Sequence, residues 1–165
     1  MAMENLIIRK AEPEDAEKII ILVKQVMEES PFFPGKSEEF KLTPKEEADY
    51  ISNLALFLAA EVDGEIVGIA TLDRSSLCRI KHTAMLGIAI IKAYKGKGIG
   101  SVLINTIFKL ARINGVEKID LEVFENNKSA LSLYKKFGFI KEGVKIKAIK
   151  TKYGYENMIL MGKFL

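Results

Sequence analysis

The residues best suited to chemistry in this sequence form a glycine-rich turn near its middle. The turn reads Lys95-Gly96-Lys97-Gly98-Ile99-Gly100-Ser101. Glycine lets the backbone adopt a positive φ and come close to a bulky anion. Where such a turn opens a helix, unpaired N–H groups and the helix dipole bind phosphate oxygens, and the two lysines add positive charge. The pattern predicts a pyrophosphate site; a strand-to-helix connection that uses glycine only for the bend is the plainer alternative.

Two common phosphate-binding motifs do not match this turn. The Walker pattern needs a glycine, four residues and then Gly-Lys-Ser/Thr, which the chain lacks. The dinucleotide fingerprint G-x-G-x-x-G also fails, because the third glycine, Gly100, comes one residue early. No convincing acidic residue stands at the end of the next predicted strand. The turn therefore belongs to a different class of phosphate-binding loop.

The turn lies between a predicted buried strand and a predicted amphipathic helix. Met85–Ile91 is a nearly unbroken apolar run, as expected for a central strand covered on both faces. The helix runs from about Gly98 to Ile113 and is closed by Asn114-Gly115. The elements predicted after it are a strand over Ile119–Phe124, a helix over Asn127–Phe137, and two strands over Phe139–Ile149 and Tyr155–Leu160.

The first half of the chain supplies the rest of the sheet. A strand over Asn5–Lys10 is followed by helices that begin at Pro13 and at Thr43-Pro44. Asp63-Gly64 between two apolar runs predicts a hairpin, because both central residues of the tight turn need positive φ. The order β-α-α-β-β-β-α-β-α-β-β predicts an α/β fold with a mixed sheet and helices on both faces. Without a repeat or linker, one domain is expected over residues 1–165.

The composition narrows the class of protein. Of the 165 residues, 48% are hydrophobic, enough for one core. No apolar run has the length of a membrane span, Met1–Lys10 carries Glu4 and lacks a signal-peptide core, and Cys78 is the single cysteine. We therefore expect a soluble cytoplasmic protein without a membrane partner. Lysines near the C-terminus suit an anionic partner, but without a recognition helix or aromatic platform nucleic acid is not expected.

A second motif follows the turn and makes the pattern more specific. It consists of Asn127, Ala130, Leu133, Tyr134, Gly138 and Phe139. Together the two motifs resemble the GNAT superfamily of N-acetyltransferases, whose coenzyme A loop reads Arg/Gln-x-x-Gly-x-Gly/Ala and whose second motif reads Asn-x-x-Ala-x-x-Leu-Tyr-x-x-x-Gly-Phe. Lys95 in the first loop position is a mild departure, because the loop binds mainly through backbone N–H groups. The resemblance extends in effect over the whole chain.

The resemblance implies a fold and a cosubstrate. The GNAT fold is a central mixed, mostly antiparallel sheet that is splayed between its fourth and fifth strands and flanked by helices on both faces. Acetyl-CoA would bind with its pyrophosphate on Lys95–Ser101 and its pantetheine arm in the splayed gap; no metal is expected. The residues implied for the arm are the backbone of Ile88, Ala89 and Ile90, and Asn127, for which simple capping of its helix is an equal alternative.

The resemblance also implies an acid and leaves the base open. Tyr134 would border the coenzyme and donate a proton to the departing thiolate; its alternative is a core aromatic. The related sub-group often carries a glutamate on the central strand where this chain has Met85. Glu122 is the predicted substitute base, against a structural hydrogen-bonding role, because it alternates with apolar neighbours on a central strand. His82, at the start of the strand before the turn, is more often incidental.

These residues predict direct acetyl transfer to a primary amine of a small molecule or of a protein N-terminus. A catalytically weak acyl-CoA-binding sensor is the alternative, which Met85 favours and Tyr134 opposes. The acceptor pocket is predicted between the loop Ser30–Lys41, with Phe32 and Phe33, and the hairpin Tyr153–Glu156. A homodimer through the C-terminal strands is implied by the resemblance, because exposed sheet edges are commonly covered by a partner.

Overall fold

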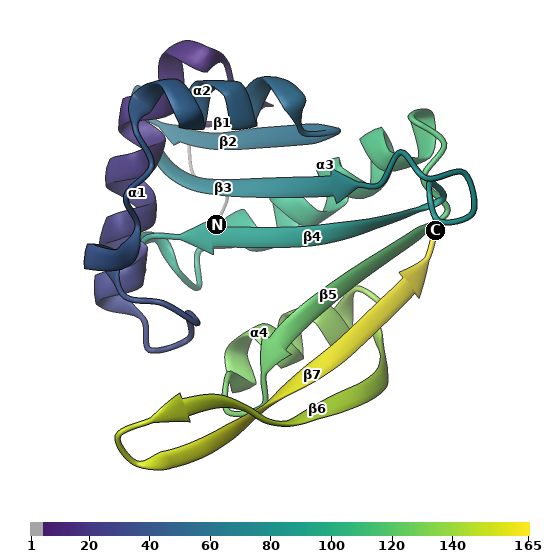
Figure 1. The fold of residues 1–165 in the computed structure, drawn as a ribbon. Helices are drawn as coiled ribbons and strands as arrows, with labels where there is room; N and C mark the ends of the chain where they lie inside the picture. Colours follow the sequence, from purple (N-terminus) through teal and green to yellow (C-terminus); the bar gives the residue numbers. More distant parts are fainter. Residues whose placement is uncertain (1–4) are drawn as a thin grey trace.

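The fold is built on one seven-stranded sheet, described here by a computed structural model for residues 5–165. The strand order is β1-β2-β3-β4-β5-β7-β6 (Figure 1). Within the described residues, neighbouring strands are antiparallel except for the parallel pair β4–β5. The predicted mixed, mostly antiparallel sheet is confirmed; Glu4, used in the expectation about export, lies outside the described residues. The strands are β1 (Leu6–Lys10), β2 (Leu56–Val62), β3 (Glu65–Arg74), β4 (Thr83–Ile90), β5 (Lys118–Phe124), β6 (Ile140–Thr151) and β7 (Gly154–Phe164).

Helices cover both faces of this sheet, as predicted. One buried cluster joins α1 and α2 to β2 and β3, and includes Ile19, Ile51 and Phe57. A larger cluster on the opposite face joins α3 to β2–β5, and α4 packs against its edge through Leu133 and Tyr134. In Figure 1, α3 and α4 lie behind the sheet, while α1 and α2 lie on its other side. The helices are α1 (Ala16–Glu29), α2 (Pro44–Asn53), α3 (Ile99–Ile113) and α4 (Lys128–Lys136).

Local signals in the sequence explain how these elements begin and turn. Thr43 caps α2: the Glu46 N–H donates to Thr43 Oγ1 at 3.2 Å, and the Thr43 N–H donates to Glu46 Oε2 at 2.8 Å. Asp63 and Gly64 both have positive φ, 51° and 83°, in the turn between β2 and β3. The predicted helix start and the predicted hairpin are therefore confirmed. Because the cap sets where α2 begins, it also sets which side chains of α2 face the sheet.

The centre of the sheet opens between β4 and β5. The two strands pair only where Thr83, Ala84 and Met85 face Lys118, Ile119 and Asp120. Beyond these residues they diverge, so that the sheet forms a V (Figure 1). The predicted splay of the fourth and fifth strands is confirmed.

The expectation that the strand over Met85–Ile91 is covered on both faces is wrong. Ala84 and Leu86 are buried under α3, but on the other face Met85 is 43% exposed and Gly87 is exposed as well. The apolar residues of β4 that are fully buried pack on the α3 side of the sheet, whereas the side toward α1 and α2 is left partly open.

An ion pair joins β1 to the start of α1 and to β2. Arg9 donates to both Asp15 oxygens, at 2.7 and 2.9 Å, and to Glu61 Oε2 at 3.0 Å. Asp15 is buried, and the hydrogen bond from Arg9 holds the pKa of its carboxyl below its usual value. Because that pKa is lowered, the stabilisation is present above the ordinary pKa of an aspartate and is lost as the pH falls through the lowered value.

The change Arg9→Met is therefore expected to lower the free energy of unfolding by about 2 kcal/mol near neutral pH. The loss should shrink on acidification, because protonated Asp15 no longer needs the guanidinium. Urea unfolding near neutral pH and in acid measures both values, with the exposed Lys10→Met as the control. A loss of the same size in acid would contradict an ionic origin.

Candidate active site

The glycines of the turn have two different tasks. Gly96 and Gly98 have φ values of 75° and 87°, which L side chains rarely adopt, and a Cβ on either would meet no atom within 4 Å. Gly100 is needed for close packing instead: a Cβ there would lie 3.1 Å from Leu133 Cδ2 of α4 and 3.6 Å from Ile90 Cδ1 of β4. The first two glycines shape the loop, and the third holds the start of α3 against β4 and α4.

The start of α3 presents unpaired N–H groups. Gly98 is the N-cap residue, and the first helical hydrogen bond runs from the Val102 N–H to the Gly98 carbonyl at 3.1 Å. The N–H groups of Ile99, Gly100 and Ser101 therefore have no acceptor within the helix, and they lie at its positive end. Lys97 lies with Nζ 4.8 Å from the centre of the Tyr94 ring. This arrangement can bind an anion such as a pyrophosphate.

Glu29, at the end of α1, fixes the segment that leads into the turn. Its carboxylate accepts a hydrogen bond from the Lys92 N–H at 2.6 Å and from Gln25 Nε2 at 2.9 Å. These two hydrogen bonds hold the pKa of Glu29 below its usual value. The connection ties the helix on one face of the sheet to the anion site at the end of β4.

The gap between β4 and β5 exposes peptide groups of β4. The Ile91 N–H donates to the Val67 carbonyl of β3 at 3.1 Å, and peptide groups alternate in direction along a strand. Ala89, paired with Ile69 on β3, therefore directs its N–H and C=O toward β3. Those of Ile88 and Ile90 are directed into the gap. Of the three residues predicted to bond the pantetheine arm, two thus present free backbone groups there.

Asn127 and Tyr134 lie on α4, beside the start of α3. Asn127 caps α4, since its Oδ1 accepts from the Ala130 N–H at 3.2 Å. The ring of Tyr134 packs edge-on against Phe139, with 5.7 Å between ring centres, and the residue is half-buried. Burial raises the pKa of Tyr134 to about 12. The phenol is therefore protonated at neutral pH, and its hydroxyl makes no hydrogen bond to any residue from 5 to 165.

Glu122 lies on β5, on the face away from its buried neighbours Leu121 and Val123. The predicted alternation along the strand is thus confirmed. Its Oε1 lies 2.5 Å from Lys145 Nζ of β6. The carboxylate is already engaged by a cation, an arrangement that suits a structural role; its role as a base stays a prediction. His82 helps to join the starts of β4 and β5 through its backbone: its carbonyl accepts hydrogen bonds from the N–H groups of Glu117 and Lys118.

A cavity of about 440 Å³ lies against the open face of β4. The loop Ser30–Lys41 borders it through Phe33 and Phe40. The hairpin Tyr153–Glu156 does not line this cavity, and its part in binding the acceptor stays a prediction. Phe32 does not line it either: its ring contacts Phe124 of β5 edge-on, with centres 5.8 Å apart. The cavity is lined by Val23, Phe33, Phe40, Leu42, Glu47, Tyr50, Phe57, Ile69, Thr71, Gly87, Ile88 and Ala89.

Glu47 of α2 is the residue that sequence reasoning missed. The residue is only 3% exposed, and no hydrogen bond or ion pair to its carboxylate is found among residues 5–165. Its oxygens are not among the fully buried atoms that lack a partner, so they reach the cavity. Desolvation by burial raises the pKa of Glu47. The spacing offered a signal, because Glu47 lies one helical turn before the buried Ile51 and so falls on the inward face of α2. A carboxylate on such a face needs a reason to be there.

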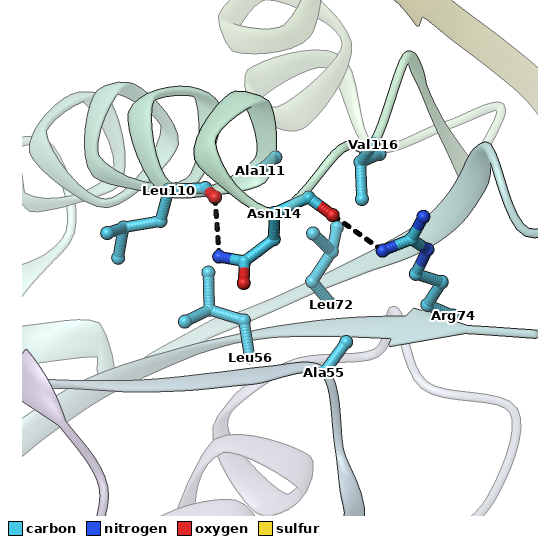
Figure 2. A pocket seen from close by; sticks show the side chains of 8 residues that line it. All are labelled: Ala55, Leu56, Leu72, Arg74, Leu110, Ala111, Asn114 and Val116. Atoms are coloured by element: carbon cyan, nitrogen blue, oxygen red, sulfur yellow. Dashed lines mark hydrogen bonds between the residues drawn. The ribbon is translucent and has the colours of Figure 1, made fainter.

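A smaller cavity, of about 200 Å³, lies at the other end of α3 (Figure 2). Arg74 reaches toward the end of this helix and donates to the carbonyls of Asn114 at 2.7 Å and Gly115 at 3.1 Å. The Asn114 side chain donates to the Leu110 carbonyl at 2.7 Å (Figure 2). The side chains of Arg74 and Asn114 thus cap the C-terminal end of α3, and their hydrogen bonds to its last carbonyls explain their presence there. This cavity has a structural explanation and lies far along α3 from the glycine-rich turn.

Comparison with known proteins agrees with this geometry. The model of the acetyltransferase (GNAT) family matches residues 22–139. The chain belongs to the GNAT family. It is an N-acetyltransferase of the GNAT type, a family that uses acetyl-CoA.

Among solved structures, this GNAT chain is similar to an acetyltransferase of the same family from Streptococcus pneumoniae. The two are 30% identical, with a TM-score of 0.92, over 97% of this chain and 99% of the other. YncA, a putative acetyltransferase from Salmonella typhimurium solved with its cofactor acetyl-CoA, has a TM-score of 0.85 at 18% identity, over 98% of this chain and 95% of the other; it shows the fold alone. The L-amino acid N-acetyltransferase AaaT of Escherichia coli (strain K12) is 36% identical over 87 residues, which cover 52% of this chain and 54% of that protein.

The two tasks of the glycines yield a controlled test of the anion site. Gly98 and Gly64 share a positive φ, 87° and 83°, and open space around a new Cβ. Gly98→Val and Gly64→Val should therefore carry a similar backbone penalty, about 1–2 kcal/mol. Only Gly98→Val is expected to weaken coenzyme A binding, by about tenfold or more, as measured by calorimetry. Equal affinities for the two variants would place the pyrophosphate elsewhere. Gly100 is a poorer test, because a larger side chain there would press on Leu133.

Proposed function

We propose that this GNAT protein transfers the acetyl group of acetyl-CoA directly to a primary amine, of a small molecule or of a protein N-terminus. The observation that carries the proposal is the position of the anion site. The glycine-rich turn after β4 leads to the unpaired N–H groups at the start of α3, and free peptide groups of β4 face the gap. The proposal includes one domain over residues 1–165 in the cytoplasm.

In this proposal the coenzyme binds along β4. The turn Lys95–Ser101 receives the pyrophosphate, and the peptide groups of Ile88 and Ile90 bond the pantetheine arm as a neighbouring strand would. Ala89 lies between them, and Asn127 borders the arm from the start of α4. A backbone N–H of β4 directed into the gap donates to the thioester oxygen as negative charge develops there.

The chemical step needs an acid for the leaving group and a base for the acceptor. The amine nitrogen attacks the thioester carbon, the C–S bond breaks, and the coenzyme leaves as a thiolate that Tyr134 stabilises by donating its phenolic proton. Two carboxylates are candidates for the base. For Glu122 to act in this way, its ion pair with Lys145 at 2.5 Å would have to open. Glu47 lies in the cavity without a partner.

The β6 edge supports the proposal of a homodimer. This strand is the outermost of the sheet beside β7, and Ile140 and Ile146 on it are 66% and 76% exposed. Apolar side chains on a free edge favour pairing with a second copy.

The first test of the proposed function is acetyl-CoA-dependent thiol release with a panel of amines, amino acids, polyamines, aminoglycosides and short peptides. Turnover with one class would establish the reaction and its acceptor. Tight binding of coenzyme A without turnover would favour an acyl-CoA sensor instead. Failure to bind coenzyme A would overturn the proposal.

Tyr134→Phe tests the acid, since it removes the hydroxyl and keeps the ring packed on Phe139. We expect kcat to fall by about 10²-fold, with the KM for acetyl-CoA nearly unchanged. The exposed Tyr153→Phe is the matched control. An unchanged kcat in Tyr134→Phe would remove this residue from the mechanism.

A further inference from the structure

The cavity against β4 is apolar except at one place. Aromatic and aliphatic side chains form most of its wall, with Thr71 and Tyr50 as uncharged polar groups. Glu47 is the one charged residue among those that line it. Its volume, about 440 Å³, falls in the range of small-molecule sites.

The surroundings of Glu47 favour a cation. An ionised carboxylate that loses part of its hydration without gaining a partner is costly, and no lysine or arginine of residues 5–165 lines the cavity. Tyr50 beside it is kept protonated, because burial and then the charges of Asp73 and Glu47 raise the pKa of the phenol. Glu47, and not Asp73, lines the cavity, so its carboxylate is the charged group that an entering amine would meet. An ammonium group entering there would supply the counter-charge that no residue from 5 to 165 provides.

The same cavity reaches the strand that faces the thioester site. Gly87, Ile88 and Ala89 of β4 form part of its wall, and the peptide of Ile88 is directed into the gap. Gly87 keeps this wall clear, since a Cβ there would lie 2.7 Å from Thr71 Oγ1. An amine bound at Glu47 would therefore lie next to β4, on the face opposite α3.

From this arrangement we infer that Glu47 binds the ammonium group of the acceptor and takes its proton, and that the acceptor is a singly charged primary amine with a compact apolar or aromatic group. The inference rests on the proposed function and names its substrate class. One carboxylate neutralises one charge, and the aromatic wall takes the apolar group. A polyamine or an aminoglycoside would have to leave further ammonium groups unpaired against apolar side chains.

The step balances with the residues already described. The ammonium gives one proton to the Glu47 carboxylate, and the free amine attacks the thioester carbon. The C–S bond breaks and the sulfur leaves as a thiolate. Tyr134 donates a proton to this sulfur, and the second proton that the nitrogen loses restores the phenol. The proton on Glu47 then passes to solvent, and the products are the amide and the thiol.

Phenethylamine is the probe for an aromatic monoamine and spermidine the probe for a polyamine. We expect kcat/KM for phenethylamine to exceed that for spermidine by about tenfold or more. In Glu47→Gln, kcat/KM for phenethylamine should fall by about 100-fold, with the KM for acetyl-CoA nearly unchanged. Asp49→Asn, on the exposed face of the same helix, is the matched control and should keep parental rates.

Two further measurements separate this inference from the proposed function and from a purely structural role. Calorimetry with coenzyme A present tests phenethylamine binding without turnover, and the parent should bind while Glu47→Gln should not. The melting temperatures of Glu47→Gln and Glu47→Leu should equal or exceed that of the parent, because an unpaired buried carboxylate has been removed.

Several outcomes would overturn the inference. One is a parent that binds coenzyme A but not phenethylamine, or that prefers spermidine. Another is a Glu47→Gln variant with nearly parental kcat/KM while Glu122→Gln loses it, which would assign the base to Glu122. A lowered melting temperature in both Glu47 variants would show that the carboxylate is structural.

Discussion

The divergence of β4 from β5 is the constraint on which the rest of the structure depends. The two strands share only a short parallel ladder at their first residues, while β4 pairs with β3 along its length and β5 with β7. The sheet therefore has two halves, β1–β4 and β5–β7, which meet at this short ladder and diverge beyond it. Backbone N–H and C=O groups need partners, so the free edge of β4 calls for water or an extended ligand. The same divergence brings the start of α3 to the open end of the gap.

Because of this divergence, β4 separates two different environments, a closely packed face and an open face. On one side α3 packs closely, and Gly100 allows its first turn to approach Ile90 and Leu133. On the other side α1 and α2 leave a cavity, because Gly87 supplies no side chain to fill it. A cosubstrate lying along the edge of β4 and a second substrate against its open face would meet at the same few peptides.

The features that the sequence predicted are those set by short-range backbone chemistry. The glycine-rich turn, the cap at Thr43 and the Asp63-Gly64 hairpin each follow from a few neighbouring residues. Other features depend on docking between distant elements. Glu47 reaches the cavity only because α2 packs over β2 and β3, and Lys145 reaches Glu122 only through the register of β6, which shifts after that residue. The order of elements could be predicted, and the two motifs indicated the family; the partner of each carboxylate could not be predicted.

Burial raises the pKa of both groups proposed to handle protons, with opposite consequences for the reaction. It raises the pKa of Glu47, which brings the carboxyl closer to the pKa of an ammonium and makes proton transfer from the amine less unfavourable. It also raises the pKa of Tyr134 to about 12, well above the value of about 8.5 for an ordinary thiol. Full transfer from this phenol to a thiolate would then be uphill. Tyr134 therefore acts best as a hydrogen-bond donor while charge builds on the sulfur. Proton transfer to the thiolate becomes favourable only if the phenolate is stabilised at the same time.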